Sequence, residues 1–373
     1  AFSFFGTPIN VQGLNIILPV GISFYTFQTL SYTIDVYKRK LEPRKDFIAF
    51  TAFVSFFPQL VAGPIERATN LLPQFYKKRT FEYDKAVDGL RQILWGLFKK
   101  IVIADNCAQI ANEIFNNSAD YSGSTLVLGA IFFTFQIYGD FSGYSDIAIG
   151  TSRLFGFDLK QNFAFPYFSR DIAEFWRRWH ISLSTWFRDY LYIPLGGSRG
   201  GTWMKVRNTF IIFIVSGFWH GANWTFIVWG ALNALYFLPL LLLNKNRSNT
   251  DTVAQGKHLP SFKEFYQIGI TFSLTVLAWV FFRAENIEHA ISYISEIFSS
   301  SLFTIPKVRP RNTILLITIF VVIEWLGREG QYAIAHLGIK WKRPIRWSLY
   351  ISLILLIFYT GNFKENIFIY FQF

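Results

Sequence analysis

The side chain best suited to chemistry is His220, which lies in a stretch, Asn208–Asn244, that contains no Lys, Arg, Asp or Glu. That stretch exceeds the roughly 20 apolar residues that a membrane span needs. A titratable group at membrane depth is costly, rare and usually faces a cavity in which it has a function. If the run is helical, Ser216, His220 and Asn223 share one face, because residues three and four apart are neighbours. A histidine that only bonds a neighbouring helix is the alternative, and we favour chemistry.

A lone imidazole in apolar surroundings can take a proton from a hydroxyl while that hydroxyl attacks an activated acyl group. A thioester needs no further activation, so acyl transfer is the simplest enzymatic interpretation. The sequence contains no metal-ligand spacing, nucleophile elbow, phosphate-binding loop or dinucleotide fingerprint. Cys107 is the single cysteine and is expected to be a buried small hydrophobe. We therefore expect no metal and no bound cofactor.

The composition places the chain in a membrane. Hydrophobic residues make up 52% of the chain and charged residues only 16%, against about 25% charged in a soluble domain. Aromatic residues alone make up 20% of the chain, more than a soluble protein of this length can hide without large apolar patches. Membrane lipids are therefore predicted partners.

Basic residues account for the net charge of +12 and cluster in what the sequence suggests are short connections, including Lys38–Lys40, Lys99-Lys100 and Arg177-Arg178. Lys and Arg are retained in short cytoplasmic loops and attract anionic headgroups. Nucleic acid is the competing partner for so basic a chain, but patches divided by apolar spans do not form one groove. We therefore predict no nucleic-acid binding.

Seven uncharged runs predict an all-α, polytopic membrane protein. They are 14–34, 47–65, 121–139, 208–244, 265–282, 312–323 and 347–363. The fourth is long enough for two helices folded back at Gly221-Ala222-Asn223. Several runs contain Pro and Gly, as at Pro58 and Gly63-Pro64, which predicts broken or re-entrant helices; such backbone is tolerated at depth only around protein or a water-filled cavity.

The segment Ser169–Tyr192 differs from these runs. Its aromatic residues recur at three- and four-residue spacing and its charges fall mainly on the other side, which predicts one amphipathic helix in the interface plane. Arg177, Arg178 and Arg188 belong to its polar side. His180 lies on or beside the aromatic side, and an interfacial anchor and a chemical role remain equally open for it.

Two other polar features have structural interpretations that involve no chemistry. Asp140 and Asp146 follow directly on the third apolar run, at or just below a membrane surface. An Asp before Ser or Gly can cap a helix or a turn, and we favour that role over chemistry. The polar segment Asn244–Ser261 is the predicted mobile loop.

Five motifs together carry a family resemblance: Phe57–Arg67 (FPQLVAGPIER), Asp140–Asp146 (DFSGYSD), Phe175–Ser184 (FWRRWHISLS), Trp186–Gly197 (WFRDYLYIPLGG) and Gly217–Trp224 (GFWHGANW). The chain resembles the membrane-bound O-acyltransferase (MBOAT) family along nearly its whole length. Within that family it most resembles the bacterial alginate O-acetyltransferase branch, with the D-alanyl transfer protein of teichoic acid synthesis as a more distant relative.

The resemblance implies a multi-spanning α-helical protein of the bacterial cytoplasmic membrane whose helices surround a tunnel or funnel. An acetyl group would pass from a cytoplasmic thioester donor, acetyl-CoA, to an extracytoplasmic polysaccharide hydroxyl or to a periplasmic or extracellular O-acetyltransferase partner. The family's essential histidine corresponds to His220, and its second functional histidine to His180. Family members have further spans before Ala1, so we expect residues 1–373 to be one acyltransferase domain that lacks its N-terminal start.

These considerations give a predicted site around His220. Asn223 is expected to orient the imidazole, with the rings of Trp219 and Trp224 among the walls. His180 is expected to border the same polar cavity, where it either guides the thioester or polarises its carbonyl.

We expect the donor's phosphates near Arg177, Arg178 and Arg188. The rival function is a transporter or flippase of the cell-envelope polysaccharide pathway, which also predicts broken helices and basic loops, though with carboxylates at depth. A scaffold that recruits a periplasmic transferase is the third possibility, and it predicts that His220 is replaceable.

Overall fold

The computed structural model describes residues 21–361 and 363, and within them all regular structure is helical, as predicted. The α-helices are α1 (Ile22–Tyr37), α2 (Phe47–Val54), α3 (Ala68–Phe75), α4 (Tyr83–Leu97), α5 (Asp105–Asn116), α6 (Gly123–Leu154), α7 (Ile172–Arg178), α8 (Ile181–Phe187), α9 (Gly201–His220), α10 (Trp224–Leu242), α11 (Phe262–Arg283), α12 (Ile287–Ile297), α13 (Arg311–Gly327) and α14 (Arg343–Thr360). Two π-helical segments, η3 (Phe98–Ala104) and η6 (Arg188–Tyr192), and the short 3₁₀ turn η2 (Phe57–Gln59) matter below.

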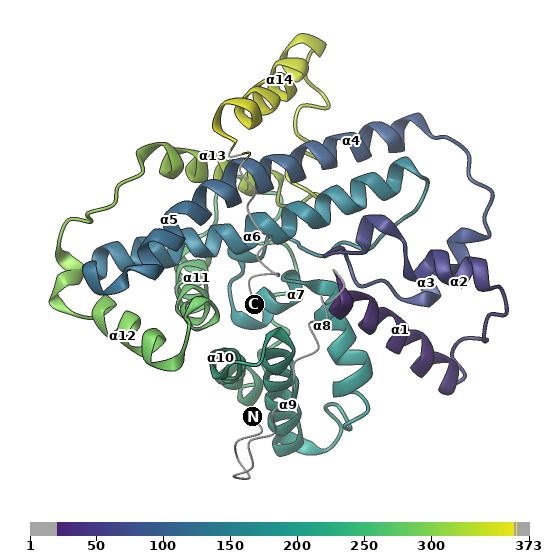
Figure 1. Cartoon of the computed structure of the whole chain (residues 1–373), viewed down its shortest axis with the longest axis horizontal. Coiled ribbons are helices and arrows are strands. Elements are labelled where there is room, and N and C mark those ends of the chain that lie inside the picture. The colour runs from purple at the N-terminus through teal and green to yellow at the C-terminus, as the bar shows by residue number, and fades with distance from the viewer. Residues whose placement is uncertain (1–20, 362, 364–373) are drawn as a thin grey trace, which may run out of the picture.

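The centre of the fold is α6, with 32 residues, and α4, η3 and α5 run along it (Figure 1). Helices α4 and α6 approach so closely that glycine is required where they cross. A Cβ on Gly96 would lie 2.6 Å from the carbonyl oxygen of Gly143, and one on Gly143 would lie 2.8 Å from that of Gly96. Small residues at such crossings are typical of helices that pack in membranes, because they let backbones approach.

The predicted fold-back at Gly221–Asn223 is confirmed. Helix α9 ends at His220, α10 begins at Trp224, and the two pack side by side as a hairpin (Figure 1). The break therefore places His220 at a helix terminus and not in the middle of a span.

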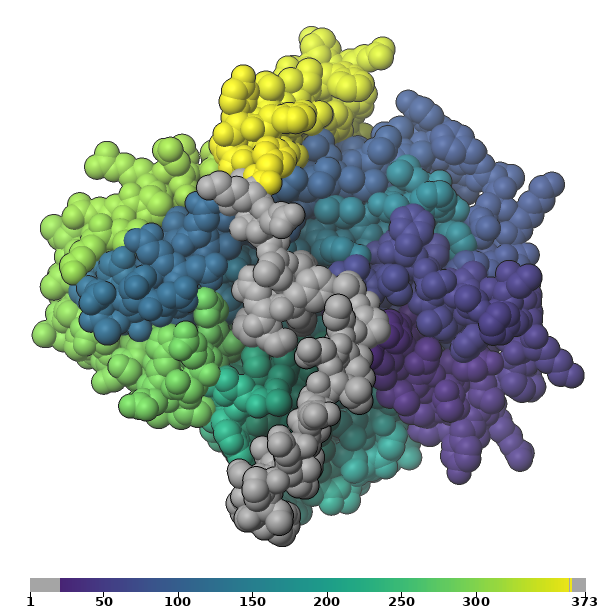
Figure 2. Space-filling view, in the orientation of Figure 1, coloured from purple at the N-terminus to yellow at the C-terminus, as the bar shows by residue number. Residues whose placement is uncertain are grey.

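Several described helices have the length and surface of membrane spans. Helices α6, α10 and α11 are long and apolar enough to cross a bilayer. Helices α13 and α14 expose large apolar side chains such as Leu315, Val322, Ile351 and Phe358, and α14 projects from the body of the molecule (Figure 2). Apolar faces of this kind are unfavourable in water and are typical of helices that contact lipid.

The second uncharged run is broken, as predicted. Its helix α2 ends at Val54, and the 3₁₀ turn η2 with Pro58 follows at Phe57–Gln59. Pro58 donates no backbone hydrogen bond and cannot continue the preceding helix. The first part of the run 14–34 lies outside the described residues; from Ile22 onward it forms α1.

The predicted capping role of Asp140 and Asp146 is wrong, because both lie inside α6 and are buried. Lys100 Nζ lies 2.8 Å from Asp140 Oδ1, and Lys99 Nζ lies 2.5 Å from Asp146 Oδ2. Lys99 and Lys100 belong to η3 and not to a loop, which corrects their assignment to a short connection. Buried charges persist when each has a partner, and these pairs join η3 to α6.

Candidate active site

The segment 169–192 does not form the single predicted helix, but α7, α8 and η6, with a break at Trp179-His180. His180 adopts the left-handed conformation, with φ 43° and ψ 56°. The cause is the extended chain around Asn162, whose carbonyl oxygen accepts from Ile181 N at 2.9 Å, while Ala164 N donates to Arg178 O at 2.9 Å. These bonds replace the ones a continuous helix would make across the break.

The Asn162 side chain fixes the tautomer of His180. Asn162 Oδ1 accepts from the backbone N–H of Ser182 at 3.2 Å and from Ser182 Oγ at 2.9 Å, and its Nδ2 donates to Ser145 Oγ at 3.1 Å. A backbone N–H can only donate, so the oxygen of the amide must face Ser182. The same oxygen lies 3.1 Å from His180 Nδ1, which must therefore carry a proton and donate it to that bond. Nε2 is left with its lone pair.

His180 Nε2 is a buried proton acceptor without a hydrogen-bond partner in the part of the chain that the structure describes. The side chain is 1% exposed, and its ring centroid lies 4.6 Å from Phe141 and 6.3 Å from Phe163. Burial lowers the pKa of His180 well below its usual value, and nearby His220 lowers it further. At neutral pH the imidazole is therefore uncharged and able to accept a proton.

His220 ends α9 inside an aromatic enclosure. Its ring centroid lies 4.7 Å from Trp219, 5.1 Å from Trp229 and 5.0 Å from Phe282. These rings come from α9, α10 and α11, so the enclosure depends on the hairpin and on its packing against α11.

A layer of aromatic rings separates the two histidines. Phe24 of α1 lies 6.3 Å from His180, in a stacked arrangement, and 6.2 Å from Trp219, which contacts His220. Trp219 therefore contacts His220 on the side that faces Phe24, and its part in a substrate site stays a prediction. The two histidines lie close enough for charge on one to affect the other, although about forty positions separate them in the sequence.

Asn223 and Trp224 are not placed as predicted. Asn223 caps α10: its Oδ1 accepts from Thr225 N at 3.1 Å, and its Nδ2 donates to Glu285 O at 2.7 Å. Both ends of its amide are thus used away from His220. Trp224 is 74% exposed and points outward. The expectation assumed one continuous helix through Asn223, and the break after His220 removes the shared face.

A cavity of about 380 Å³, called the first cavity, lies between α7, α8, α9 and α10. Apolar side chains form most of its wall: Trp176, Leu183, Phe187, Ile212, Phe213, Phe237 and Leu241. Ser216, one turn before His220, and Ser184, one turn after His180, also line it. Its lining includes neither histidine. It comes within one helical turn of each histidine, so a cavity bordered by both stays a prediction.

Three arginines line the first cavity: the predicted Arg177 and Arg188, and Arg247, which the sequence did not single out. Arg177 donates to the carbonyl oxygens of Asn246 at 2.8 Å and Asn249 at 2.7 Å. Burial lowers the pKa of Arg177, and the like charge of Arg247 contributes in the same direction. Close positive charges in an apolar cavity favour an anion.

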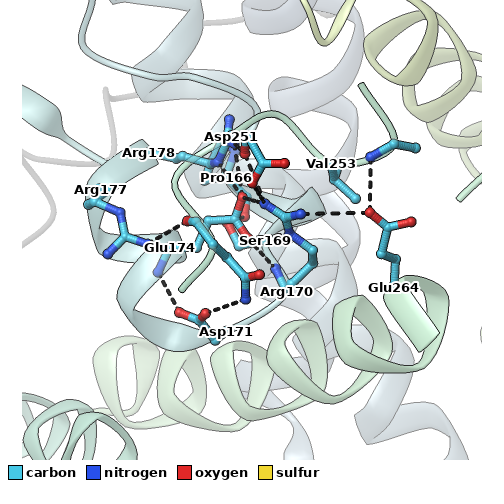
Figure 3. Close-up of polar contacts among 12 residues, drawn as sticks. Pro166, Ser169, Arg170, Asp171, Glu174, Arg177, Arg178, Asp251, Val253 and Glu264 are labelled. Carbon is cyan, nitrogen blue, oxygen red and sulfur yellow. Dashed lines mark hydrogen bonds and ion pairs between the residues drawn. The ribbon is translucent and has the colours of Figure 1, made fainter. Parts of the chain in front are cut away.

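Arg178, in contrast, belongs to a structural network (Figure 3). Its guanidinium donates to Glu174 Oε1 at 3.0 Å, to Ala164 O at 3.2 Å and to Asp251 O at 2.8 Å, and it does not line the first cavity. Arg170 pairs with the same Glu174 and with Asp251. This network fastens the segment 244–261 to α7, so the loop predicted to be mobile is held by several hydrogen bonds.

No group of three or more His, Cys, Asp or Glu side chains within residues 21–361 and 363 is arranged to hold a metal ion. Cys107 is fully buried among apolar side chains, and burial keeps it from acting as a nucleophile.

Comparison with known proteins gives one consistent family. A family model described as "MBOAT, membrane-bound O-acyltransferase family" matches residues 38–282. The chain is 41% identical over 323 residues to the probable alginate O-acetylase AlgI of Pseudomonas aeruginosa, which covers 85% of this chain and 60% of that relative. It is 32% identical to the peptidoglycan O-acetyltransferase of Helicobacter pylori, with 98% of this chain and 76% of the relative covered. With the teichoic acid D-alanyltransferase of Streptococcus thermophilus it shares 30% identity, over 70% of this chain and 68% of the relative. The chain thus spans about 60% of the length of the Pseudomonas relative.

Proposed function

The chain belongs to the membrane-bound O-acyltransferase family, and on that premise we propose that it transfers an acetyl group from a thioester donor to a hydroxyl group outside the cytoplasm. One observation carries the proposal: the first cavity is apolar, is lined by three arginines and comes within one helical turn of both histidines. Such a cavity suits a long donor molecule with phosphates at one end and a reactive acyl group at the other.

We propose acetyl-CoA as the donor. Its phosphates would be bound by Arg177, Arg188 and Arg247, because guanidinium groups form charge-assisted and bidentate hydrogen bonds with phosphate. The apolar wall would enclose the pantetheine arm. Acetyl-CoA would be a substrate and not a resident cofactor, since it leaves as CoA after each transfer.

The proposed reaction has one proton to move. The acceptor hydroxyl attacks the thioester carbonyl carbon, the new C–O bond forms and the C–S bond breaks. A base takes the hydroxyl proton, and the sulfur leaves as the thiol after receiving a proton. We propose His220 as the base, because it is the one side chain of a long uncharged run whose ordinary pKa lies near neutral pH, and because aromatic rings of α10 and α11 lie beside it.

We propose that His180 guides the donor and does not polarise its carbonyl. Polarising a carbonyl requires an N–H donor, but the bond to Asn162 Oδ1 leaves the lone pair on Nε2. A lone pair can accept a hydrogen bond from an amide N–H, which the pantetheine arm supplies. Because Nε2 is enclosed, side chains of the aromatic layer would have to move for that contact to form.

The proposed acceptor is a cell-envelope polysaccharide or a partner O-acetyltransferase on the outer side of a bacterial cytoplasmic membrane. The relatives named above carry names that refer to alginate, peptidoglycan and teichoic acid, all extracytoplasmic polymers. The variety of polymers in these names supports the class of acceptor and leaves its identity to experiment.

The test uses purified protein in neutral detergent with acetyl-CoA labelled in its acetyl group, and with polysaccharide or a hydroxyl-bearing surrogate. The expected result is release of CoA coupled to labelling of the acceptor, both lost in His220→Ala. A transporter or flippase would release no CoA. A scaffold would give the same result with His220→Ala as with the unchanged protein.

A further inference from the structure

A second cavity, of about 440 Å³, lies on the other side of α8 and η6 from the first. Residues from four separated parts of the chain line it: the end of α1, the start of α3, the extended segment before α7, and α8 with η6. Arg188 lines both cavities. The α8–η6 segment therefore separates the two cavities. The proposed acetyl transfer involves only the first cavity.

The second cavity is strongly basic. Five cationic side chains line it: Lys38, Lys40, Arg67, Lys160 and Arg188. The lining contains two carboxylates, and both have partners. Asp189 lies 2.7 Å from Arg188 Nε and 3.4 Å from Arg67 Nη2, and Asp35 accepts a hydrogen bond from Tyr190 at 2.7 Å. The three lysines form no ion pair with a described residue, so their charges remain available to a ligand.

Arg67 is the most informative member of this cavity. Its side chain is 11% exposed, and its guanidinium carbon lies 4.5 Å from the ring centroid of Tyr190, a cation–π contact that fixes the plane of the group. Its one ion pair, with Asp189, is long at 3.4 Å. Nη1 is buried and has no hydrogen-bond partner in residues 21–361 and 363. A buried, incompletely bonded guanidinium is costly unless something supplies acceptors.

Hydroxyl groups complete the lining, from Thr69, Ser182 and Thr185. The hydroxyls of Ser182 and Thr185 already donate, to Asn162 Oδ1 at 2.9 Å and to Ser182 O at 3.0 Å, so the Thr69 hydroxyl is the one that can donate to an anion, while the cations around it supply the charge. The backbone here is also held in place: Ile65 N donates to Ser182 Oγ at 3.0 Å, and Lys160 N donates to Glu66 Oε1 at 2.5 Å. The site is therefore positioned before any ligand arrives.

We propose that the second cavity binds a phosphate group, held by Arg67 and the three lysines, on the opposite side of α8 from the proposed acyl path. The phosphate can come from a nucleotide other than the acetyl donor, whose phosphates the first cavity is proposed to hold, or from an anionic lipid headgroup. Arg188 lines both cavities, so its charge can act on a ligand in either one. The proposal extends the proposed function but does not require it, since phosphate binding is measured without any acetyl transfer.

The experiment titrates the purified protein in neutral detergent with adenosine 5′-monophosphate, a nucleotide phosphate that lacks the 3′-phosphate of CoA, by calorimetry. A second arm compares nanodiscs that contain phosphatidylglycerol with nanodiscs of phosphatidylcholine alone. Saturable binding of the nucleotide, or tighter lipid association with phosphatidylglycerol, assigns the source of the phosphate. No saturable binding in either arm would overturn the proposal.

Two variants locate the site. Arg67→Gln should weaken the successful probe by about ten- to a hundredfold, the usual range for a lost charged hydrogen bond. Because Arg67 is largely buried, its replacement can disturb folding. A second variant therefore changes three exposed lysines of the cavity, Lys38→Gln, Lys40→Gln and Lys160→Gln, and should weaken binding about three- to tenfold. A matched triple, Lys45→Gln, Lys77→Gln and Lys78→Gln, removes the same charge away from the cavity and should bind as the unchanged protein does.

The outcomes are distinct from those of the acyl-transfer test. If both lysine triples weaken binding equally, only net charge matters and the site is refuted. Binding that is lost in Arg247→Gln of the first cavity but kept in Arg67→Gln would also refute it. If the second-cavity variants lose phosphate binding while His220→Ala keeps it, the site stands, whatever the acetyl-transfer assay gives.

Discussion

The two histidines lie at two different kinds of helix break. His220 ends α9 where the chain turns into α10, and aromatic rings from three helices surround it. His180 begins α8 in a left-handed conformation, and the side chain and main chain of Asn162 hold it there. The first break is shaped by packing, the second by hydrogen bonds.

The difference has a chemical meaning. A left-handed backbone at a residue other than glycine costs of order 1–3 kcal/mol and persists where the surroundings enforce it, often at functional sites. At His180 the enforcing bonds also select the tautomer. At His220 the neighbouring rings make the surroundings largely apolar. We infer that hydrogen bonds orient His180, which suits a group that guides the donor. The apolar surroundings of His220 suit a group that takes up a proton.

The sharpest way to break this comparison is to remove His220. His220→Ala should lower acetyl transfer by roughly 10²–10⁴-fold, because the general base is lost. His220→Gln should be no better, since an amide does not take a proton. The measurement is initial rate with labelled acetyl-CoA, with membrane insertion and detergent-extracted yield as controls. Near-normal transfer by a well-expressed variant would show that His220 is not the base.

Changing Asn162 tests the orientation of His180. Asn162→Ala should lower the rate by roughly 10- to 100-fold, as expected for a misplaced catalytic-site group, and should add little in a His180→Ala background, because the two act as a unit. If the two changes are instead additive, Asn162 acts on the fold and not on His180.

Asn162→Asp gives the same pair a pH signature. Burial holds the pKa of His180 well below its usual value, so its protonation should not limit the wild-type rate near neutral pH. A carboxylate at the position of Asn162 Oδ1, 3.1 Å from Nδ1, favours the imidazolium and raises that pKa. The acid limb of the pH–rate profile should therefore move to higher pH in this variant. An unchanged profile would mean that the protonation of His180 does not affect the rate.

Much of the fold follows from the sequence, because long uncharged runs have few alternatives in a membrane. The run 208–244 gave the α9–α10 hairpin, and 265–282 gave α11. Asp140 and Asp146 were misassigned because local patterns favour a cap there. Their actual partners, Lys99 and Lys100, lie about forty positions away and meet them only when η3 packs on α6.

The site was less predictable than the fold. His180 and His220 were found by their apolar surroundings, but nothing in the spacing identifies Asn162, which lies 18 positions before His180 in an extended segment. Arg247 was overlooked because it lies in the polar loop, where a basic residue is ordinary. Its signal is spatial: the Figure 3 network draws that loop back over α7 and beside Arg177.

Two arginines, Arg247 in the lining of the first cavity and Arg178 outside it, should separate donor binding from structure. Arg247→Gln should raise the KM for acetyl-CoA by about three- to tenfold with little change in kcat, as expected when ground-state binding is removed. Arg178→Gln should instead lower the thermal stability of the protein, because Glu174, 1% exposed, would lose a buried partner. The two readouts are substrate-saturation kinetics and a thermal-unfolding curve in detergent. A KM effect for Arg178→Gln without destabilisation would return Arg178 to the donor site.

The smallest expected effect distinguishes the two tryptophans that flank the His220 break. Trp219 contacts His220 and lies between it and Phe24, so Trp219→Ala should open the enclosure to water and lower acetyl transfer severalfold, with more hydrolysis of the thioester. Trp224 is 74% exposed, so Trp224→Ala should stay within about twofold of the unchanged protein, as surface substitutions usually do. The measurement is the ratio of acetylated acceptor to free acetate in each variant. Equal losses of acetyl transfer in Trp219→Ala and Trp224→Ala would mean that the helix break as a whole positions His220. The contact between Trp219 and His220 would then have no separate effect on the rate.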